Sequence, residues 1–392
     1  MQNKLIGLLV LLSLVIPKIN AQDFNVDDIN SITTAAPFLL ITPDGRAGGM
    51  GDIGVATTSD FNSQHHNPSK VAFNDAALSV GINFTPWMRE LVNDVYLGGF
   101  SVASKIDERS AWATSFKYFT LGEIQLTDDI GTETTVEKPN ELALDGTYAL
   151  KLTENFSMGV TLRYIRSDFA LKTVPDSNME TVNAFSVDLS GYYQGEEKNY
   201  GDFNGIIRGG FNIANIGPKV TYVHGGRENF IPTNMKLGGG FDFILDNYNT
   251  VSLNLETTKL LVPTPPYRER NDDGSYTIIK GKDNDVGFVN GMFQSFNDAP
   301  GGSKEELREY TWAIGSEYLY NDVFALRGGY FHEHETKGAR QFFTLGAGFK
   351  FKATNIDISY LFNTSNIHNP LENTLRFSLG INLGESFFKP TE

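Results

Sequence analysis

The sequence predicts an all-β protein, a 14-stranded antiparallel transmembrane β-barrel. From residue 76 onward apolar and polar residues alternate with period two, which is the pattern of β-strands. Most of the alternating segments are about 9–15 residues long, as in membrane-spanning strands and unlike soluble strands of ~5–6 residues. Short and long connections alternate along the chain, which is typical of outer-membrane barrels.

Composition agrees with this class. Charged residues make up 20 % of the 392 residues, below the ~25 % of an ordinary soluble protein. The formal charge of −15 argues against a nucleic-acid partner, which requires clustered Lys and Arg. The chain has no cysteine, so disulfides and thiolate metal sites are excluded.

Two segments are predicted to precede the barrel. Residues 1–21 have the pattern of a secretory signal peptide, because Lys4 precedes an apolar run from Leu5 to Ile16 that is too short to span a membrane. Cleavage is expected after Ala21. Residues 22–75 contain no convincing membrane strand. We expect them to form an N-terminal hatch that plugs the lumen, with a periplasmic tail as the alternative.

Residues 76–392 are predicted to form the barrel. Its last strand has the clearest register, with Phe377 and Leu379 on one face and Arg376 and Ser378 on the other. The strands are expected to start near residues 76, 93, 110, 139, 155, 180, 204, 232, 248, 308, 322, 340, 354 and 372.

Charged residues inside these strands are expected to face the lumen. A charge that faces lipid at the bilayer centre costs about 2–4 kcal/mol, and each of the thirteen lies opposite the apolar face of its strand. They are Lys117, Asp145, Arg163, Asp188, Arg208, Lys236, Asp242, Glu256, Glu317, Arg327, Lys350, Asp357 and Arg376.

The connections predict the orientation. Outer-membrane barrels have short periplasmic turns and long extracellular loops. The longest loop, 260–307, is therefore expected outside the cell and the turn at 246–249 in the periplasm. The same parity places both termini in the periplasm.

Apolar loop residues are candidates for binding a partner, because aromatic side chains are favoured interface anchors. Trp87 has a position in the membrane-interface belt as its alternative. The candidates are Trp87 and Met88 in the first loop, and Pro265, Pro266, Tyr267, Phe288, Met292, Phe293 and Phe296 in the longest one.

The sequence predicts no catalytic, cofactor-binding or metal-ligating residues. Gly49 to Gly54 matches G-x-G-x-x-G, but a dinucleotide site needs a strand before the motif and a helix after it. His332 and His334 lack the spacing of a zinc-binding H-E-x-x-H helix. We therefore expect a protein that is not an enzyme.

The segment from Ser31 to Phe73 resembles the N-terminal region of the PorV family of the Bacteroidetes type IX secretion system, most specifically from Phe38 to Thr58. The following Asn67-Pro68-Ser69 looks like the NPA element of FadL-like barrels, with Ser69 where alanine is usual. The residues of this hatch motif are Gly48, Gly49, Gly51, Gly54, Asn67 and Pro68.

The resemblance implies a FadL-like barrel in the outer membrane of a Gram-negative bacterium, surrounded by membrane lipid and lipopolysaccharide. Its expected partners are the large translocon barrel, cargo proteins with C-terminal signal domains, and the surface sortase complex that receives the cargo. Two other functions stay open. A FadL-type transporter of hydrophobic small molecules would need an apolar path past the hatch. An outer-membrane lipid hydrolase would need Ser, His and Asn, or paired carboxylates, at one rim.

Overall fold

The computed structural model describes residues 29–87, 92, 94–127, 130–169, 178–365 and 373–385. The predicted signal peptide and the candidate Met88 lie outside these residues. Within them, no helix is long and apolar enough to cross a membrane.

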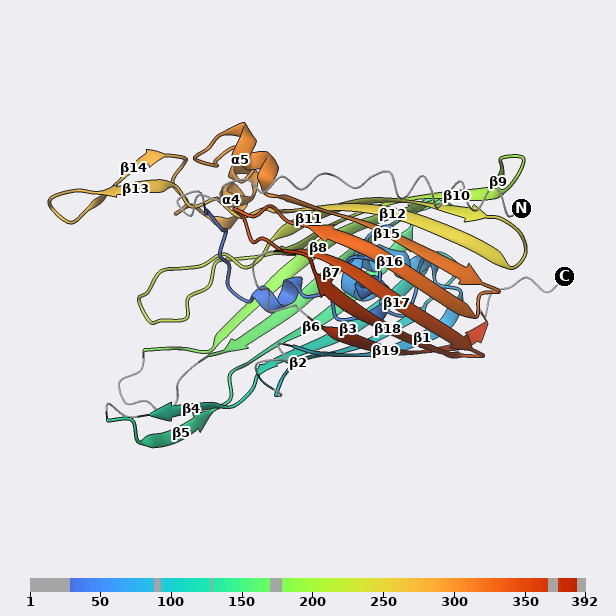
Figure 1. Cartoon of the computed structure of the whole chain (residues 1–392), viewed down its shortest axis with the longest axis horizontal. Coiled ribbons are helices and arrows are strands. Elements are labelled where there is room, and N and C mark those ends of the chain that lie inside the picture. Colours follow the sequence, from blue (N-terminus) through green and yellow to red (C-terminus); the bar gives the residue numbers. More distant parts are fainter. Residues whose placement is uncertain are drawn as a thin grey trace.

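Fourteen long antiparallel strands of the described chain form a closed barrel (Figure 1). Each pairs with its neighbours in chain order, and the pairing of the first with the last closes the barrel. The strands are β1 (Ala76–Pro86), β2 (Val95–Lys105), β3 (Ser110–Leu121), β6 (Asn140–Lys151), β7 (Phe156–Asp168), β8 (Val182–Gln194), β10 (Asn204–Ile216), β11 (Asn234–Ile244), β12 (Asn249–Leu260), β15 (Tyr310–Tyr320), β16 (Phe324–His332), β17 (Gln341–Phe351), β18 (Thr354–Asn363) and β19 (Leu375–Glu385). The predicted barrel is confirmed, and the largest error in a strand start is at β19, which begins at residue 375 and not near 372.

The chain also forms smaller elements outside the fourteen barrel strands. The loops carry the hairpins β4 (Ile124–Thr127) with β5 (Glu133–Glu137) and β13 (Tyr267–Arg270) with β14 (Tyr276–Lys280), and the helices α4 (Phe288–Gln294) and α5 (Ser303–Arg308). The two-residue strand β9 (Lys198–Asn199) pairs with the first residues of β10 at the opposite end. Before the barrel come η2 (Pro37–Leu40), α2 (Gly45–Gly48), α3 (Ser63–His66) and η3 (Pro68–Phe73).

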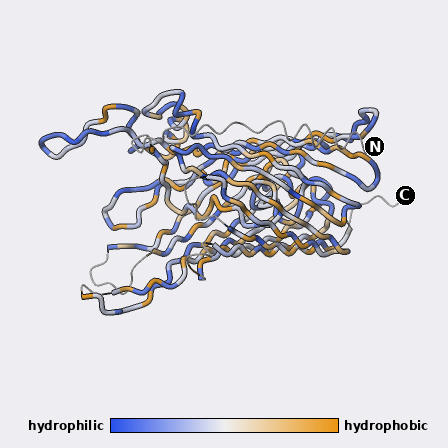
Figure 2. Tube along the Cα trace, in the orientation of Figure 1, coloured by the Kyte–Doolittle hydropathy of each residue, from blue (hydrophilic) through white to orange (hydrophobic). Residues whose placement is uncertain are grey.

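The two faces of the wall follow the predicted alternation (Figure 2). On β19 Leu379 is 41 % exposed, whereas its neighbour Ser378 is 3 % exposed. All thirteen predicted lumen charges lie in the inward register of their strands. Eleven of them are buried, Lys236 is half-buried, and Lys350 is exposed near the end of its strand.

Outward-facing aromatic residues gather near both ends of the wall, as in the girdles of outer-membrane barrels. Along β15, Trp312 lies near the end with the long loops and Tyr320 at the end with the short turns. Eight residues separate them (320 − 312), or roughly 20 Å along the axis of a barrel with strands tilted by ~40°. The wall therefore has the height of a membrane-spanning band.

Candidate functional site

The chain before the barrel passes through the lumen from the long-loop end to the short-turn end (Figure 1). At the long-loop end, the backbone N–H of Asn30 donates to the carbonyl of Thr336, at 3.0 Å, and its side-chain amide donates to Glu305, at 3.0 Å. At the short-turn end, Val71 and Ala72 pack on alanines of β2, β3 and β6.

One prediction concerns the termini. Strand parity placed both termini in the periplasm, and the mature N-terminus expected near residue 22 lies outside the described residues. The first described residue, Ile29, lies beside the long loops, whereas Glu385 ends β19 at the short-turn end. The described chain therefore begins and ends at opposite ends of the barrel.

An apolar layer fills the lumen near the long loops. Phe38 of η2 stacks on Phe119 of β3 with ring centroids 6.5 Å apart, among buried residues such as Leu97 and Ile165. Trp87 packs edge-on against Phe119 at 6.1 Å. Because Trp87 packs inward, its alternative placement in the membrane-interface belt is wrong, and its side chain is half-buried.

Below this layer, ion pairs fix the segment to the wall. Arg46 of α2 forms one with Glu317 of β15, at 2.8 Å, and another with Asp60, at 2.9 Å. Glu317 also binds Arg327 of β16, at 2.6 Å, and Arg327 binds Asp357 of β18, at 2.7 Å. Opposite charges in the lumen are thus arranged as a continuous network that includes the segment.

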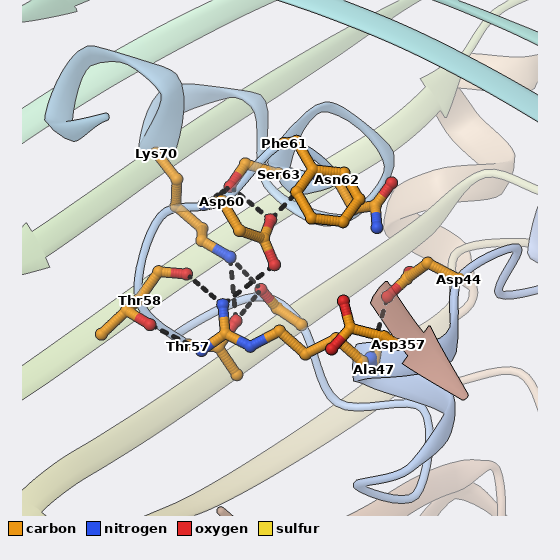
Figure 3. Close-up of polar contacts among 12 residues, drawn as sticks. Asp44, Ala47, Thr57, Thr58, Asp60, Phe61, Asn62, Ser63, Lys70 and Asp357 are labelled. Atoms are coloured by element: carbon orange, nitrogen blue, oxygen red, sulfur yellow. Dashed lines mark hydrogen bonds and ion pairs between the residues drawn. The ribbon is translucent and has the colours of Figure 1, made fainter. Parts of the chain in front are cut away.

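The segment also binds itself together in this region (Figure 3). The buried amine of Lys70 donates to the carbonyl of Gly54 and to the hydroxyl of Thr57, both at 2.9 Å. Asp60 accepts the hydroxyl of Ser63, at 3.1 Å. The first two bonds join η3 to the loop 54–57, and the third joins Asp60 to the start of α3.

The hatch-motif glycines make close contacts that other residues would break. Gly51 has φ +73°, and a Cβ there would lie 3.0 Å from the carbonyl oxygen of Tyr330. A Cβ on Gly54 would lie 2.2 Å from the ring of His66. Similar contacts surround Gly48, against Arg376, and Gly49, against Gly346.

The backbone around these glycines is already bonded. The N–H groups of Gly54 and Val55 both donate to one carboxylate oxygen of Glu256, and that of Gly51 donates to Thr344. The G-x-G-x-x-G match thus places N–H groups on the barrel wall, where they hold the segment in place.

The Asn-Pro-Ser element has a similar role. Asn67 is fully buried, and its amide donates to the carbonyls of Val55 and Gly191, at 2.8 and 3.0 Å. Its carbonyl oxygen accepts the hydroxyl of Ser69, at 2.6 Å, and Pro68 starts η3. Serine at this position therefore adds a hydrogen bond inside the element.

A cavity of about 980 Å³ lies at the short-turn end. Its inner wall includes Arg46, Asp60 and Glu317, and its mouth includes Lys352 and Asp75. Nine of its 24 lining residues are charged, and the cavity meets the N-terminal segment at its inner end.

At the long-loop end, two hairpins, β4–β5 and β13–β14, project beyond the barrel (Figure 1). They expose apolar residues that sequence reasoning missed, since each hairpin is too short for a clear alternation: Ile130, Val136, Tyr276 and Ile279. Of the candidates in loop 260–307, Phe293 and Phe296 are exposed, while Pro265, Pro266, Tyr267, Phe288 and Met292 are half-buried.

No group of three His, Asp or Glu side chains in the described ranges is placed to hold a metal ion. His332 stacks on the outward-facing Trp312, at 5.1 Å, and His334 bonds to Thr336. The His-Glu-His-Glu tract is thus part of the barrel rim.

A closed barrel with two aromatic girdles and an internal N-terminal segment defines an outer-membrane protein of the FadL-like fold. Within that class, the chain belongs to the PorV family: residues 24–267 match the family described as "Type IX secretion system protein PorV". The predicted resemblance is confirmed.

Solved structures resemble the chain in fold. The P. putida toluene transporter TodX is 12 % identical with a TM-score of 0.50, over 88 % of this chain and 99 % of that one. A Pseudomonas aeruginosa FadL homologue is 12 % identical with a TM-score of 0.45, over 91 % and 100 %. The Ralstonia pickettii toluene transporter TbuX is 12 % identical with a TM-score of 0.47, over 87 % and 98 %. A search of curated proteins finds no match.

Proposed function

We propose that this protein is a non-enzymatic subunit of a type IX secretion system that acts by binding other proteins at its long-loop face. In this role it binds the translocon barrel and the C-terminal signal domains of cargo, and it passes cargo to the surface attachment machinery. Family membership supports the secretion system. The observation that carries the binding role is the lumen blocked by residues 29–75, which leaves the loops as the surface available for partners.

Transport of hydrophobic small molecules is the alternative that the fold suggests. Such a molecule would have to pass the apolar layer around Phe38 and then the network of Arg46, Glu317, Arg327 and Asp357. Separating buried ion pairs is costly, since a lone buried charge is destabilising by about 3–5 kcal/mol. The charged lumen therefore favours a binding subunit over a channel for apolar molecules.

The hairpin β13–β14 is the part of the loop face that we expect to bind protein. Tyr276 and Ile279 on it are exposed in a projecting element, where only a partner would remove them from water. The ends of the hairpin are close together, because a Cβ on Gly281 would lie 3.2 Å from Pro266 Cα. Residues 267–280 can therefore be excised without disturbing the barrel.

The test compares secretion and uptake in cells. Deleting the gene should retain cargo with the type IX signal inside the cell while uptake of hydrophobic nutrients continues. Replacing Tyr276 and Ile279 by Ser, or excising 267–280, should lower secretion and recovery of the co-purifying translocon. Tyr248→Ser, which changes an exposed aromatic at the opposite end, is the matched control. Normal secretion with failed uptake would favour the transporter, and normal secretion with altered lipid acylation would favour the hydrolase.

A further inference from the structure

Lys259 is a buried cation on the outside of the barrel. It stands in the outward register of β12, after the lipid-facing Leu253 and Leu255, and it pairs with Met235 and Tyr310 of the neighbouring strands. Its side chain is nevertheless 0 % exposed. Something therefore covers the outer face of the wall at this height.

The cover is the second half of the longest loop. Glu309 binds the Lys259 amine at 2.7 Å and Glu306 of α5 at 3.3 Å. The rings of Phe296 and Tyr310 lie 5.9 and 5.1 Å from that amine. Figure 1 likewise shows α4 and α5 beside the barrel near the loop end of β11 and β12. Glu305 of α5 also binds Lys337, at 2.6 Å, and Asn30, at 3.0 Å, so the loop folds over the rim of the barrel and its outer side at this point.

Both helices of this cover have an inner and an outer face. On α5 the inner face carries Glu305 and Glu306. On α4 the inner face carries Gly291, against Phe230 and Pro263. The outer faces are apolar and cationic: they carry the exposed Val289, Phe293, Lys304 and Leu307, and the half-buried Arg308 lies at the edge of α5.

The outer faces are open. Phe293 is 74 % exposed and Leu307 is 73 % exposed. Lys304 and Arg308 flank Leu307 at spacings i−3 and i+1, and within the part of the chain that the structure describes neither forms an ion pair. A cationic and apolar face of this kind is typical of helices that lie in a membrane interface.

The height of the cover matches that interface. Tyr310 follows α5 almost directly and lies two residues from Trp312 of the loop-end girdle. Two residues of a strand span roughly 7 Å, so α5 lies close above the level where aromatic belts meet lipid headgroups.

We propose that the outer face of α4 and α5 (Val289, Phe293, Lys304, Leu307 and Arg308) is a lipid-binding site. The apolar side chains enter the outer leaflet beside the barrel, and Lys304 and Arg308 bind the phosphate groups of anionic lipid. Lipid is the favoured occupant because the surface continues the lipid-facing wall and because, among the residues that the structure describes, its two cations form no ion pair, although the chain has a net charge of −15. This assigns Phe293 to the membrane, and it does not depend on the proposed secretion role.

The first test measures immersion. Because the chain has no cysteine, single spin labels can be placed at Phe293→Cys and Leu307→Cys in protein reconstituted into phosphatidylcholine–phosphatidylglycerol vesicles. Both should be accessible to oxygen and shielded from a water-soluble nickel chelate, like a label at Leu255→Cys on the lipid-facing wall. A label at Ser275→Cys, in the turn of the projecting hairpin, is the aqueous control. Nickel accessibility equal to that of Ser275→Cys would overturn the proposal.

The second test measures charge recognition. Association of spin-labelled phosphatidylglycerol with the protein should fall roughly tenfold in the Lys304→Gln/Arg308→Gln variant, since each cation near an anionic surface contributes substantially to binding. Lys280→Gln/Lys282→Gln removes the same charge from exposed positions of the same loop and should change little. An equal loss in both variants would overturn the proposal. Protection of both labels only after the co-purified translocon is added would also overturn it, in favour of a protein partner.

Discussion

Replacing Arg46 by Ala should release the N-terminal segment from the wall. Arg46 binds Glu317 through two nitrogens, at 3.1 and 2.8 Å, and it also binds Asp60, at 2.9 Å. All three side chains are largely buried, with exposed fractions of 12 %, 3 % and 16 %. Removing the cation therefore leaves two buried carboxylates without one of their partners.

The remaining contacts decide the magnitude. Removing one partner of a buried pair costs about 3–5 kcal/mol. Glu317 keeps Arg327, at 2.6 Å, and Asp60 keeps the hydroxyl of Ser63, at 3.1 Å, so the lower end of that range applies. About 3 kcal/mol raises the population of barrels with an unseated segment more than 100-fold, since each 1.4 kcal/mol is a factor of ten.

Conductance across a planar bilayer measures that population. Wild-type protein should be closed nearly all the time, and Arg46→Ala should show frequent openings together with a lower urea midpoint for unfolding. Arg46→Lys keeps the charge but loses the bidentate geometry, so it should fall between the two. If Arg46→Ala were as closed and as stable as wild type, the ion-pair network would not be what holds the segment.

Four other predictions follow from the structure. Leu379→Arg places a charge on the lipid face of β19 and should cost about 2–4 kcal/mol in barrel stability, measured by heat-modifiable gel migration, whereas Leu379→Met should assemble normally. Gly54→Ala should destabilise the segment by about 1–3 kcal/mol, because its Cβ would overlap the ring of His66; a urea midpoint equal to that of wild type would contradict this. On intact cells an impermeant thiol reagent should label Ile29→Cys and Ser275→Cys and spare Asn247→Cys; labelling of Asn247→Cys alone would invert the topology. Burial, with Glu306 and Glu309 nearby, raises the pKa of Asp298 to about 6 from an ordinary value near ~3.9. Between these two pKa values the folded loop holds a proton on Asp298 that the unfolded loop has released. The resistance of the loop to limited proteolysis should therefore fall as the pH rises from about 4 to about 6, and Asp298→Asn should remove that dependence.

The wall could be predicted from the sequence because its information is local. Each strand buries one face in the lumen and exposes the other to lipid, so apolar and polar residues alternate with period two in every strand. The thirteen lumen charges follow from the same rule. At the ends of strands the rule weakens: Lys259 has the outward register, yet it is buried because a distant loop folds over it.

The path of the N-terminal segment could not be predicted in detail, because its contacts join residues far apart in the chain. Gly54 and Glu256 form a hydrogen bond although 202 positions separate them. No periodic pattern in the sequence around either residue indicates that contact. Only the fold identifies the wall residue that each glycine of the hatch motif meets. Trp87 is a similar case, since an aromatic residue in a loop has the same sequence signature whether it turns outward or packs inward on Phe119.

The charges of the lumen link these observations to function. A barrel that conducts apolar molecules gains nothing from ion pairs between its plug and its wall, because each pair adds a barrier to displacement of the plug. Here Arg46 joins the plug to β15, and Asp52 joins it to β19 through Arg376, at 2.6 Å. Together with the apolar layer around Phe38, these pairs hold the segment at two heights and in two sectors of the wall. A barrel blocked by a firmly held segment is suited to presenting loops at the membrane surface, which is the property that a docking subunit requires.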